Sequence, residues 1–365
     1  MYLSHVKVSY FRNFDYIDIP LTKGINVFYG NNGAGKSSIL EFLYYLSLAK
    51  SFRSSNHQSL IKTGYDYFSI FAVLTDSDDA KHSEGLERKY DGTIKVLFDN
   101  KNVSRNSDMA KNLCVQIISP DSFDLLTEGP SVRRSFIDWG VFYSYDEYGK
   151  IFSDFLRVLK QRNSLIHNKA DEISLEYWDS VFVRLSDKIS ELRTLYIEEF
   201  SREILEITEK FIPEFKFKFS LNCGYKREDG LLNILKKNRD REMCFGYTIY
   251  GPHKCDLKIK ANDIIASQVL SRGQQKLLVI SMHLAQGLLY AKKTGKNCVF
   301  LIDDVSSELD EHNQKILCDL IKSTRSSAQY FLTLLGDSRL AWYQESFPDA
   351  SFFSVSDNMV VTQNN

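Results

Sequence analysis

The sequence predicts an α/β domain assembled from both ends of the chain, with a mainly helical arm inserted between them. Apolar and polar residues alternate through much of the first hundred positions, as they do in half-buried strands. From residue 173 to residue 211 the apolar residues recur every three or four positions, which is typical of a long amphipathic helix. After residue 244 strand and helix patterns return. We therefore expect an α/β head from residues 1–140 and 245–365, and a helical arm from residues 141–244.

The composition excludes several classes of protein. Apolar residues make up 43% of the 365 residues and charged residues 25%, which is ordinary for a globular chain. No run approaches the roughly 18 apolar residues of a membrane span, and the first residues alternate like a strand rather than a signal peptide. We therefore expect a cytoplasmic protein with no membrane partner. The six cysteines lack C-x-x-C spacing, which favours buried free thiols over a zinc site.

A glycine-rich segment follows the apolar run of residues 25–29. It fits the phosphate-loop pattern G-x-x-x-x-G-K-[ST] and stands between a predicted strand and a predicted helix, as that pattern requires. Its glycines let successive backbone N–H groups point at phosphate oxygens, and the helix N-terminus adds partial positive charge. We expect Lys36 to reach the β- and γ-phosphates of ATP, and the Ser37 hydroxyl to ligate Mg²⁺. The predicted nucleotide-binding residues here are Gly30, Asn31, Asn32, Gly33, Ala34, Gly35, Lys36, Ser37 and Ser38.

The middle of the chain differs in character from both ends. Residues 151–166 and 173–211 have helical spacing, and the second segment ends before Pro213, which cannot continue a helix. Alternation over residues 215–221 then predicts a strand. The charged stretch 226–241 is typical of a surface excursion. Together these segments form the predicted arm.

An apolar strand near the end of the chain delivers two carboxylates. Residues 298–302 are apolar, and Asp303 and Asp304 follow at the carboxyl end, where ligands bind in open α/β sheets. A polar strand end would by itself explain the two residues equally well. Paired with the phosphate loop, they match a Walker B element. In that element Asp303 would hold Mg²⁺, and Asp304 would orient or deprotonate the attacking water.

A third motif, residues 270–275, resembles the L-S-G-G-Q signature of ABC ATPases. The predicted helix after it would place the Ser271 hydroxyl and the N–H groups near Gly273 at a helix N-terminus, an anion site suited to a γ-phosphate. The residues expected to contact nucleotide here are Ser271, Arg272, Gly273 and Gln274. Taken alone, the segment is better explained as an ordinary serine-capped helix.

The order of the motifs favours the ABC class. After the Walker B element, residues 307–310 match the S-x-L-D loop of these ATPases and add Asp310 to the expected nucleotide contacts. Gln116 is a candidate for the glutamine that contacts Mg²⁺ or the attacking water, with a surface glutamine at a strand end as the alternative. The histidine usual after the last strand is missing, so either Thr333 senses the γ-phosphate or no such sensor exists. This departure, and Asp304 in place of a longer glutamate, leave the hydrolysis rate open.

The signature and the phosphate loop together imply a dimer. In ABC ATPases the two motifs of one domain lie too far apart to hold the same nucleotide, and one protomer's signature caps ATP bound to the other. Because this chain carries one copy of each motif, we expect a two-fold homodimer with two ATP molecules between the protomers. Loss of the γ-phosphate would remove that bridge.

Further segments are similar to the RecF family of bacterial recombination-repair proteins. They are residues 11–14, 116–121, 129–138, 159–163 and 251–254, together with the signature and the S-x-L-D loop. The resemblance spans nearly the whole chain, and the segments that begin at Gly129 and Gly251 are specific to this family within the wider class. Glu128 departs from the family, which usually has glycine there.

The resemblance implies an ATPase that dimerises on DNA when ATP is bound and hydrolyses ATP slowly, with stimulation by DNA. It also implies help in loading the strand-exchange recombinase at single-strand gaps, together with RecO and RecR, and binding to DNA that is double-stranded, gapped or carries single-strand junctions. Arg12 would lie near the nucleotide. The net charge of −1 gives no bulk attraction to nucleic acid, so DNA contacts would depend on local basic clusters. A solvated face is the alternative for each cluster, namely Arg133–Arg134, Lys160 with Arg162, and Lys236–Lys237 with Arg239 and Arg241.

Two other functions fit the motif order. A transporter-type ABC subunit would need a membrane partner, and the helical arm and the segment 251–254 argue against it. The second is a protein-recruitment platform that uses ATP as a structural switch without DNA-directed hydrolysis. The sequence does not identify the residues that contact DNA or RecR.

Overall fold

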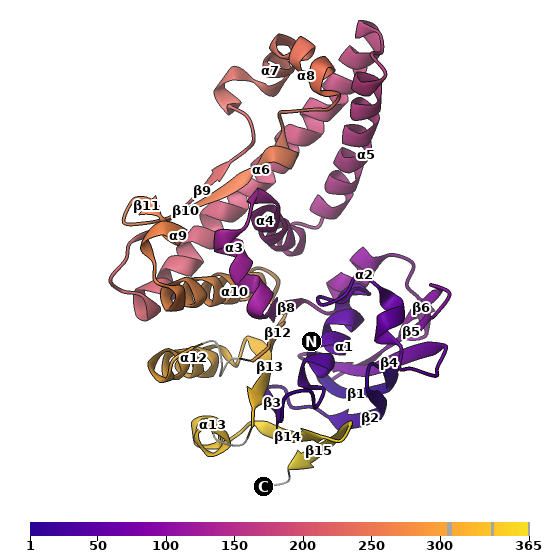
Figure 1. Cartoon of the computed structure of the whole chain (residues 1–365), viewed down its shortest axis with the longest axis vertical. Helices are drawn as coiled ribbons and strands as arrows, with labels where there is room; N and C mark the ends of the chain where they lie inside the picture. The colour runs from indigo at the N-terminus through magenta and orange to yellow at the C-terminus, as the bar shows by residue number, and fades with distance from the viewer. Residues whose placement is uncertain (305–308, 337–338, 364–365) are drawn as a thin grey trace. The chain divides into compact units, whose positions relative to one another are not determined.

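The computed structural model describes residues 1–304, 309–336 and 339–363 (Figure 1). Its contacts divide the chain into two compact units, Met1–Ser122 with Ile280–Asn365, and Phe123–Val279. The first unit contains two six-stranded sheets, and the second contains the long helices α5 and α6 (bounds below) and a three-stranded sheet.

The second unit extends beyond the expected arm, 141–244, at both ends. The reason is packing between segments far apart in the sequence. Helix α4 (Pro130–Ser144) contacts both α6 (Glu172–Phe211) and β10 (Asp256–Ala261), so all three belong to one unit. Which segments serve as head and arm in function stays a prediction.

The central sheet of the first unit is mainly parallel, with the strand order β15-β14-β3-β13-β12-β8. Its end strand β15 runs antiparallel to β14, and the other neighbours are parallel. The inner strands are buried almost throughout, as strands covered on both faces are. The strands are β3 (Ile25–Gly30), β8 (Val115–Ile118), β12 (Cys298–Ile302), β13 (Ala328–Leu335), β14 (Ser351–Ser356) and β15 (Met359–Gln363). The helices of this unit include α1 (Lys36–Leu48), α2 (Asn106–Asn112), α12 (Glu311–Thr324) and α13 (Leu340–Ser346).

The other sheet of this unit is antiparallel, in the order β2-β1-β4-β5-β6-β7, and confirms the alternation seen in the sequence. The expected turn at Asp91–Gly92 joins β5 to β6, and Gly92 takes a φ of 94°, which glycine tolerates. Side chains of this sheet pack with α1 into one buried cluster. Within it, Phe11 lies edge-on to both Phe42 and Phe68. The strands are β1 (Tyr2–Phe11), β2 (Phe14–Pro20), β4 (Tyr67–Thr75), β5 (Lys81–Lys89), β6 (Ile94–Phe98) and β7 (Lys101–Asn102).

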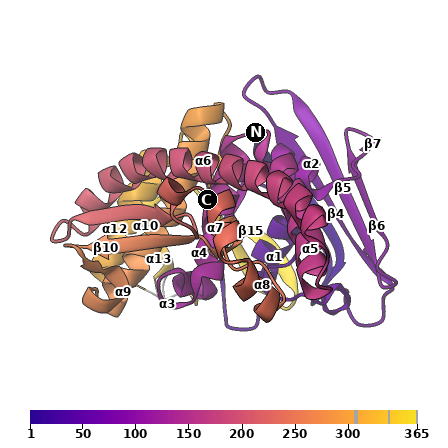
Figure 2. The ribbon, with the colours of Figure 1, turned by 90° about the horizontal axis from the view of Figure 1, so that it is seen from above.

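The second unit is built on the 40-residue helix α6, close to the helix predicted over 173–211. Asp171 caps its start by accepting from the Ser174 N–H, and it ends at Phe211, before Pro213. Helix α5 (Tyr148–His167) and strand β9 pack along it, as Figures 1 and 2 show. The remaining elements are α3 (Asp124–Thr127), β9 (Phe217–Asn222), α7 (Leu231–Lys237), α8 (Arg239–Phe245), β11 (Ile264–Ile265), α9 (Ala266–Val269) and the start of α10 (Arg272–Thr294).

A buried ionic network fixes one end of this unit. Arg162 of α5 has no exposed surface and donates to Asp179 of α6, to Glu242 of α8 and to the Thr248 hydroxyl, at 2.6–2.8 Å. Both carboxylates are also buried: Glu242 pairs with this guanidinium, and Asp179 shares it with a second cation, Arg239. The segment 226–241, expected to be a surface excursion, is mostly exposed and forms α7 and the start of α8, and this network anchors α8 through Glu242.

The long helices are amphipathic. Charged residues recur along α6 and α10, and each helix buries one face. Within residues 1–304, 309–336 and 339–363, no helix combines the length and the apolar character that a membrane span requires.

Candidate nucleotide-binding site

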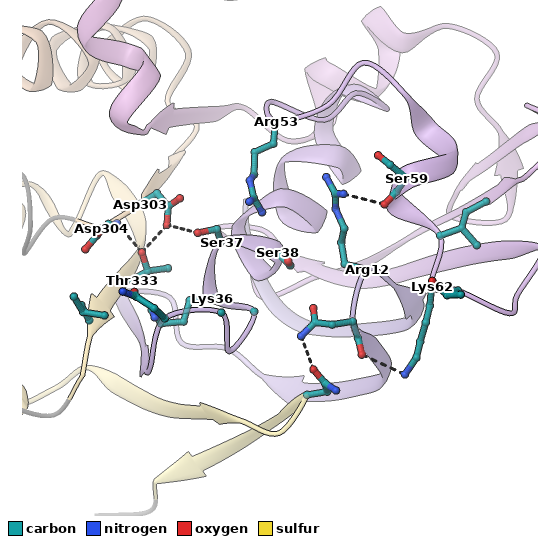
Figure 3. A pocket seen from close by; sticks show the side chains of 18 residues that line it. Arg12, Lys36, Ser37, Ser38, Arg53, Ser59, Lys62, Asp303, Asp304 and Thr333 are labelled. Carbon is teal, nitrogen blue, oxygen red and sulfur yellow. Dashed lines mark hydrogen bonds between the residues drawn. The ribbon is translucent and has the colours of Figure 1, made fainter.

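A pocket of about 730 Å³ lies in the first unit, at the carboxyl ends of β3, β12 and β13 (Figure 3). This is the edge where open α/β sheets bind ligands. Its walls come from the phosphate loop, the end of β12, strand β13 and the segment 59–63. The lining residues are Arg12, Asn13, Asn32, Gly33, Gly35, Lys36, Ser37, Ser38, Arg53, Ser59, Ile61, Lys62, Thr63, Asp303, Asp304, Thr333, Leu335 and Asn358.

The phosphate loop takes the predicted strand–loop–helix form between β3 and α1. Gly35 has a φ of 107°, and a Cβ there would lie 2.6 Å from the Phe14 ring, so only glycine fits. It is also the N-cap of α1, so the helix N-terminus opens at the loop. Gly30, Asn31 and Ala34 complete the loop without lining the pocket.

Lys36 folds over this loop. Its ammonium donates to the carbonyl oxygens of Gly30 at 2.9 Å and Asn31 at 2.8 Å. Burial lowers the pKa of Lys36, although the nearby Asp303 and Asp304 act in the opposite direction. The Lys36 ammonium is therefore held beside the phosphate loop, where its positive charge would stabilise a bound phosphate.

Three side chains connect the loop to the end of β12. The Ser37 hydroxyl donates to Asp303 Oδ1 at 3.0 Å, and the Thr333 hydroxyl donates to the same oxygen at 2.7 Å. The Thr333 oxygen accepts from the Asp304 N–H, also at 2.7 Å. Asp304 has a φ of 50°, a left-handed conformation that costs energy outside glycine and is held here by this bond. Thr333, buried on β13, thus bonds the carboxylate of Asp303 and the main chain of Asp304 (Figure 3).

The oxygen atoms at this point suit Mg²⁺. A hydroxyl and a carboxylate that lie 3.0 Å apart can share one hard cation, with water and phosphate oxygens filling the other positions. Ser37 and Asp303 are the residues that would hold the ion. The residues described contain no group of three or more His, Cys, Asp or Glu side chains that could form an all-protein metal site.

Cations from the N-terminal half complete the pocket. Arg12, at a φ of 53°, forms a two-pronged ion pair with the fully buried Glu41 of α1, at 2.7 and 2.9 Å, and donates to the Ser59 carbonyl. Lys62 pairs with Asp15 at 2.6 Å. Arg53 lies 3.8 Å from Glu41. The expected position of Arg12 at the site is therefore what the geometry shows.

Sequence reasoning missed several lining residues. Arg53, Lys62 and Asn358 come from three different segments, and no spacing rule connects them with the phosphate loop. Asn358 reaches the pocket from the β14–β15 turn and accepts from Asn13 Nδ2 at 2.7 Å. The turn itself was detectable, since Asp357–Asn358 is a favoured two-residue hairpin turn, but its position was not.

Gln116 does not line the pocket, and the role expected for it is not met in this geometry. It lies within β8 opposite Phe300, not at the strand's end. Its side chain is buried and donates to Gln286 of α10 at 2.8 Å. The sequence predicted that the strand ends at Gln116, whereas β8 continues to Ile118, so the glutamine lies inside the sheet; its contact with Mg²⁺ or the attacking water stays a prediction.

The signature residues belong to the second unit and form a helix start. The Ser271 N–H donates to Gln274 Oε1 at 2.9 Å, and the Ser271 hydroxyl accepts from the Gln274 N–H at 3.3 Å. This reciprocal capping box leaves Ser271 and Arg272 exposed and precedes α10. Asp310 caps α12 by accepting from the Asn313 N–H. The first two residues of the S-x-L-D loop, Ser307 and Glu308, lie outside the described residues.

Most of the basic clusters named above are engaged within the protein. Arg162 is fully buried, Arg133 pairs with Asp256, and Arg134 donates to the Cys255 carbonyl. Lys236 pairs with Glu176, and Arg239 pairs with Asp179. Arg162 therefore does not lie on the solvated face that was its alternative, and contact of the exposed members of the clusters with DNA stays a prediction.

Comparison with known proteins adds to this geometry. A family model described as the RecF/RecN/SMC N terminal domain matches residues 2–346. The DNA replication and repair protein RecF of Vibrio vulnificus (strain CMCP6) is 37% identical over 341 residues, which is 93% of this chain and 94% of that protein. RecF of Shewanella frigidimarina (strain NCIMB 400) is 36% identical over 361 residues, 99% of each chain.

Solved structures show the same similarity. The recombination mediator protein RecF-ATP of the RecFOR pathway aligns with a TM-score of 0.87 at 25% identity, covering 100% of this chain and 98% of that one. The Smc head bound to the C-winged helix domain of ScpA aligns with a TM-score of 0.64 at 19% identity, covering 100% and 98%. The second likeness concerns the fold alone.

Proposed function

Because the chain belongs to the RecF family of DNA replication and repair proteins, we propose that it is an ATP-switched DNA-binding repair protein of the cytoplasm. ATP binding would close a homodimer on DNA, and slow hydrolysis, stimulated by DNA, would release it. The partners proposed are double-stranded or gapped DNA, RecO and RecR, and the outcome is loading of the recombinase at single-strand gaps.

The hydrogen-bonded group of Ser37, Asp303, Asp304 and Thr333 beside the phosphate loop carries this proposal. It supplies the parts that ATP hydrolysis needs: a cradle of N–H groups, the Lys36 ammonium, oxygen ligands for Mg²⁺, and a carboxylate at Asp304 to orient water. The Mg²⁺, when bound, would neutralise phosphate charge. ATP is supported further by the RecF-ATP structure, which the whole chain matches.

The signature supports a site shared between two protomers. None of Ser271, Arg272, Gly273 and Gln274 is among the described residues that line the pocket. Ser271 and Arg272 are exposed at the start of α10, where backbone N–H groups can meet an anion. A second protomer could therefore present its signature to the γ-phosphate bound by the first.

The first experiment measures ATP hydrolysis by the purified protein at low salt, with and without double-stranded DNA. We expect a slow basal rate that DNA raises several-fold. Absence of stimulation, with nucleotide binding intact, would favour the recruitment-platform hypothesis over a DNA-directed switch.

The second experiment tests the shared site. Ser271→Arg should leave ATP affinity unchanged, because Ser271 lies outside the pocket, and should abolish the ATP-dependent dimer in analytical ultracentrifugation. Ser180→Arg, the same change at an exposed serine of α6 in the same unit, is the matched control. An undiminished dimer in Ser271→Arg would refute the sandwich arrangement.

A further inference from the structure

The three-stranded sheet of the second unit has an open edge on its central strand, β10. On one side β9 pairs with the whole of β10, from Asp256 to Ala261. On the other side β11 pairs only with Lys260 and Ala261. The first four residues of β10 therefore have a strand neighbour on one side only.

The hydrogen-bond phase shows which groups face this edge. The Asn262 N–H donates to the Lys216 carbonyl, so Asn262 and every second residue before it point their main-chain groups toward β9. The intervening residues, Leu257 and Ile259, point theirs the other way. The β11 pairs reach back no further than the Ile259 carbonyl, which leaves the Leu257 N–H and C=O and the Ile259 N–H facing the open edge.

The edge is bounded at both ends. At its start the guanidinium of Arg134, on α4, donates a hydrogen bond to the Cys255 carbonyl at 3.0 Å. At its far end the Asn262–Asp263 turn leads into β11. Between these limits lies room for about three or four residues of added strand. Unpaired strand edges are templates for another chain unless something covers them.

A groove of about 480 Å³ lies against this edge. Because the Leu257 side chain is 1% exposed, it is the main chain of β10 that faces the groove. The opposite walls are the end of α3 and helix α9. The lining residues are Leu126, Thr127, Glu128, Arg133, Asp256, Leu257, Lys258, Ile259, Lys260, Ile265, Ala266, Ser267 and Gln268.

The charges and apolar groups in the groove specify its occupant. Arg133 and Asp256 neutralise each other at 2.7 Å, which leaves Lys258 and Lys260 against Glu128. The two lysines share one face of β10, while Leu257 and Ile259 share the other. A strand added here would place alternate side chains beside the lysines and the others toward the apolar wall, where Leu126 and Ala266 lie. Such a strand alternates acidic and apolar residues.

We propose that this groove binds an extended acidic peptide of a partner protein, which adds to β10 as a fourth strand. The main-chain groups of Leu257 and Ile259 bind its backbone, and Lys258 and Lys260 select its carboxylates. The added strand covers an edge that the chain leaves open, in a groove with a net positive charge.

A peptide bound in this groove would affect the conformation of the signature segment. The Gln275 amide, one turn into α10, donates to the Ser267 carbonyl at 3.2 Å and to the Leu270 carbonyl at 3.0 Å. Ser267 lines the groove, and Ser271 follows Leu270, so one side chain links the peptide site to the capping box. This coupling rests on the proposed function, whereas peptide binding does not.

The test uses the full-length protein and a fluorescein-labelled eight-residue peptide that alternates Asp with Val. We expect saturable binding by fluorescence anisotropy, and slowed hydrogen exchange at the Leu257 and Ile259 amides. Methylating one set of alternate peptide nitrogens should weaken binding about tenfold, while methylating the other set should not, since only one set faces β10. A Lys-Val peptide should not bind.

The variant Lys258→Glu/Lys260→Glu should bind the Asp-Val peptide with an affinity at least about tenfold lower. Lys95→Glu, an exposed lysine of strand β6 in the other unit, should not. No saturable binding of the Asp-Val peptide, equal loss with both methylated sets, or full affinity in the double variant would each overturn the proposal. Peptide binding that leaves ATP hydrolysis unchanged would remove only the coupling to the signature.

Discussion

Replacing Thr333 with valine removes the hydroxyl that joins the Asp303 carboxylate to the Asp304 main-chain N–H, while keeping the shape of the side chain. In the native protein this buried hydroxyl donates to Asp303 Oδ1 and accepts from the Asp304 N–H, both at 2.7 Å. Valine fills the same volume, so no cavity forms. The effect is therefore confined to two hydrogen bonds and to the orientation of the two aspartates.

The size of the effect follows from those bonds. A hydrogen bond to a charged group contributes about 1.5–3 kcal/mol, and a half-buried N–H left without an acceptor costs about 1 kcal/mol. We expect Thr333→Val to lower the free energy of unfolding by about 3 kcal/mol. Asp304 would also be released from its left-handed conformation, and displacement of a catalytic group by about 1 Å can reduce a rate about a hundredfold.

The assay pairs urea unfolding with single-turnover ATP hydrolysis. Thr333→Ser is the control, because it keeps the hydroxyl and removes only one methyl group, about 1 kcal/mol of stability. We expect Thr333→Val to hydrolyse at a small fraction of the native rate while still binding ATP, and Thr333→Ser to stay within a few-fold. Native hydrolysis in the valine variant would show that the hydroxyl does not orient the Walker B carboxylates.

Three further substitutions test other parts of the protein. Lys36→Ala should weaken ATP binding at least about tenfold by isothermal titration calorimetry, because the only ammonium folded over the described phosphate loop is lost. Burial without a partner raises the pKa of Glu84 to about 8 from its usual 4.5, so the folded state keeps a proton that the unfolded chain releases. The free energy of unfolding should fall by up to ~1.4 kcal/mol per pH unit as the pH rises through that window, and Glu84→Gln should remove the slope in urea titrations. Arg162→Met should cost about 3–5 kcal/mol in the same assay, because Glu242 loses the cation that it pairs with while buried and Asp179 keeps only Arg239, whereas Met at the exposed Arg157 of the same helix should cost almost nothing.

The local parts of the fold were predictable from the sequence. Helix α6 matches the segment 173–211 to within a residue, because its period continues for ten turns and Pro213 marks its end. Strand β12 matches 298–302, because a fully buried parallel strand is apolar at every position. The boundary between the two units was not predictable, because it depends on α4 packing against β10 more than a hundred residues later.

The same division applies to the candidate site. The phosphate loop and the Walker B carboxylates are contiguous in sequence, and the structure brings them together. Gln116 shows the limit of this reasoning, since the two residues by which β8 continues past it decide whether the glutamine lies at the strand end or inside the sheet. The buried Arg162 shows a second limit: a cluster of basic residues in the sequence does not reveal which of them form buried ion pairs in the folded protein.

The hydrogen bonds of Thr333 also give a physical reason for the slow hydrolysis that we propose. A histidine at this position has two ring nitrogens, so it can bond inward through one and donate to the γ-phosphate through the other. Threonine has one hydroxyl proton, and here that proton is donated to Asp303. In this arrangement Thr333 cannot also donate to the γ-phosphate, and a donor must come from elsewhere. The exposed N-terminus of α10, supplied by a second protomer, is the donor that the proposed dimer brings, because the N–H groups of Arg272 and Gly273 lie in its first turn, where a helix offers no acceptor of its own. ATP hydrolysis would then be fast only in the dimer, so the lifetime of the switch would depend on assembly of the two protomers.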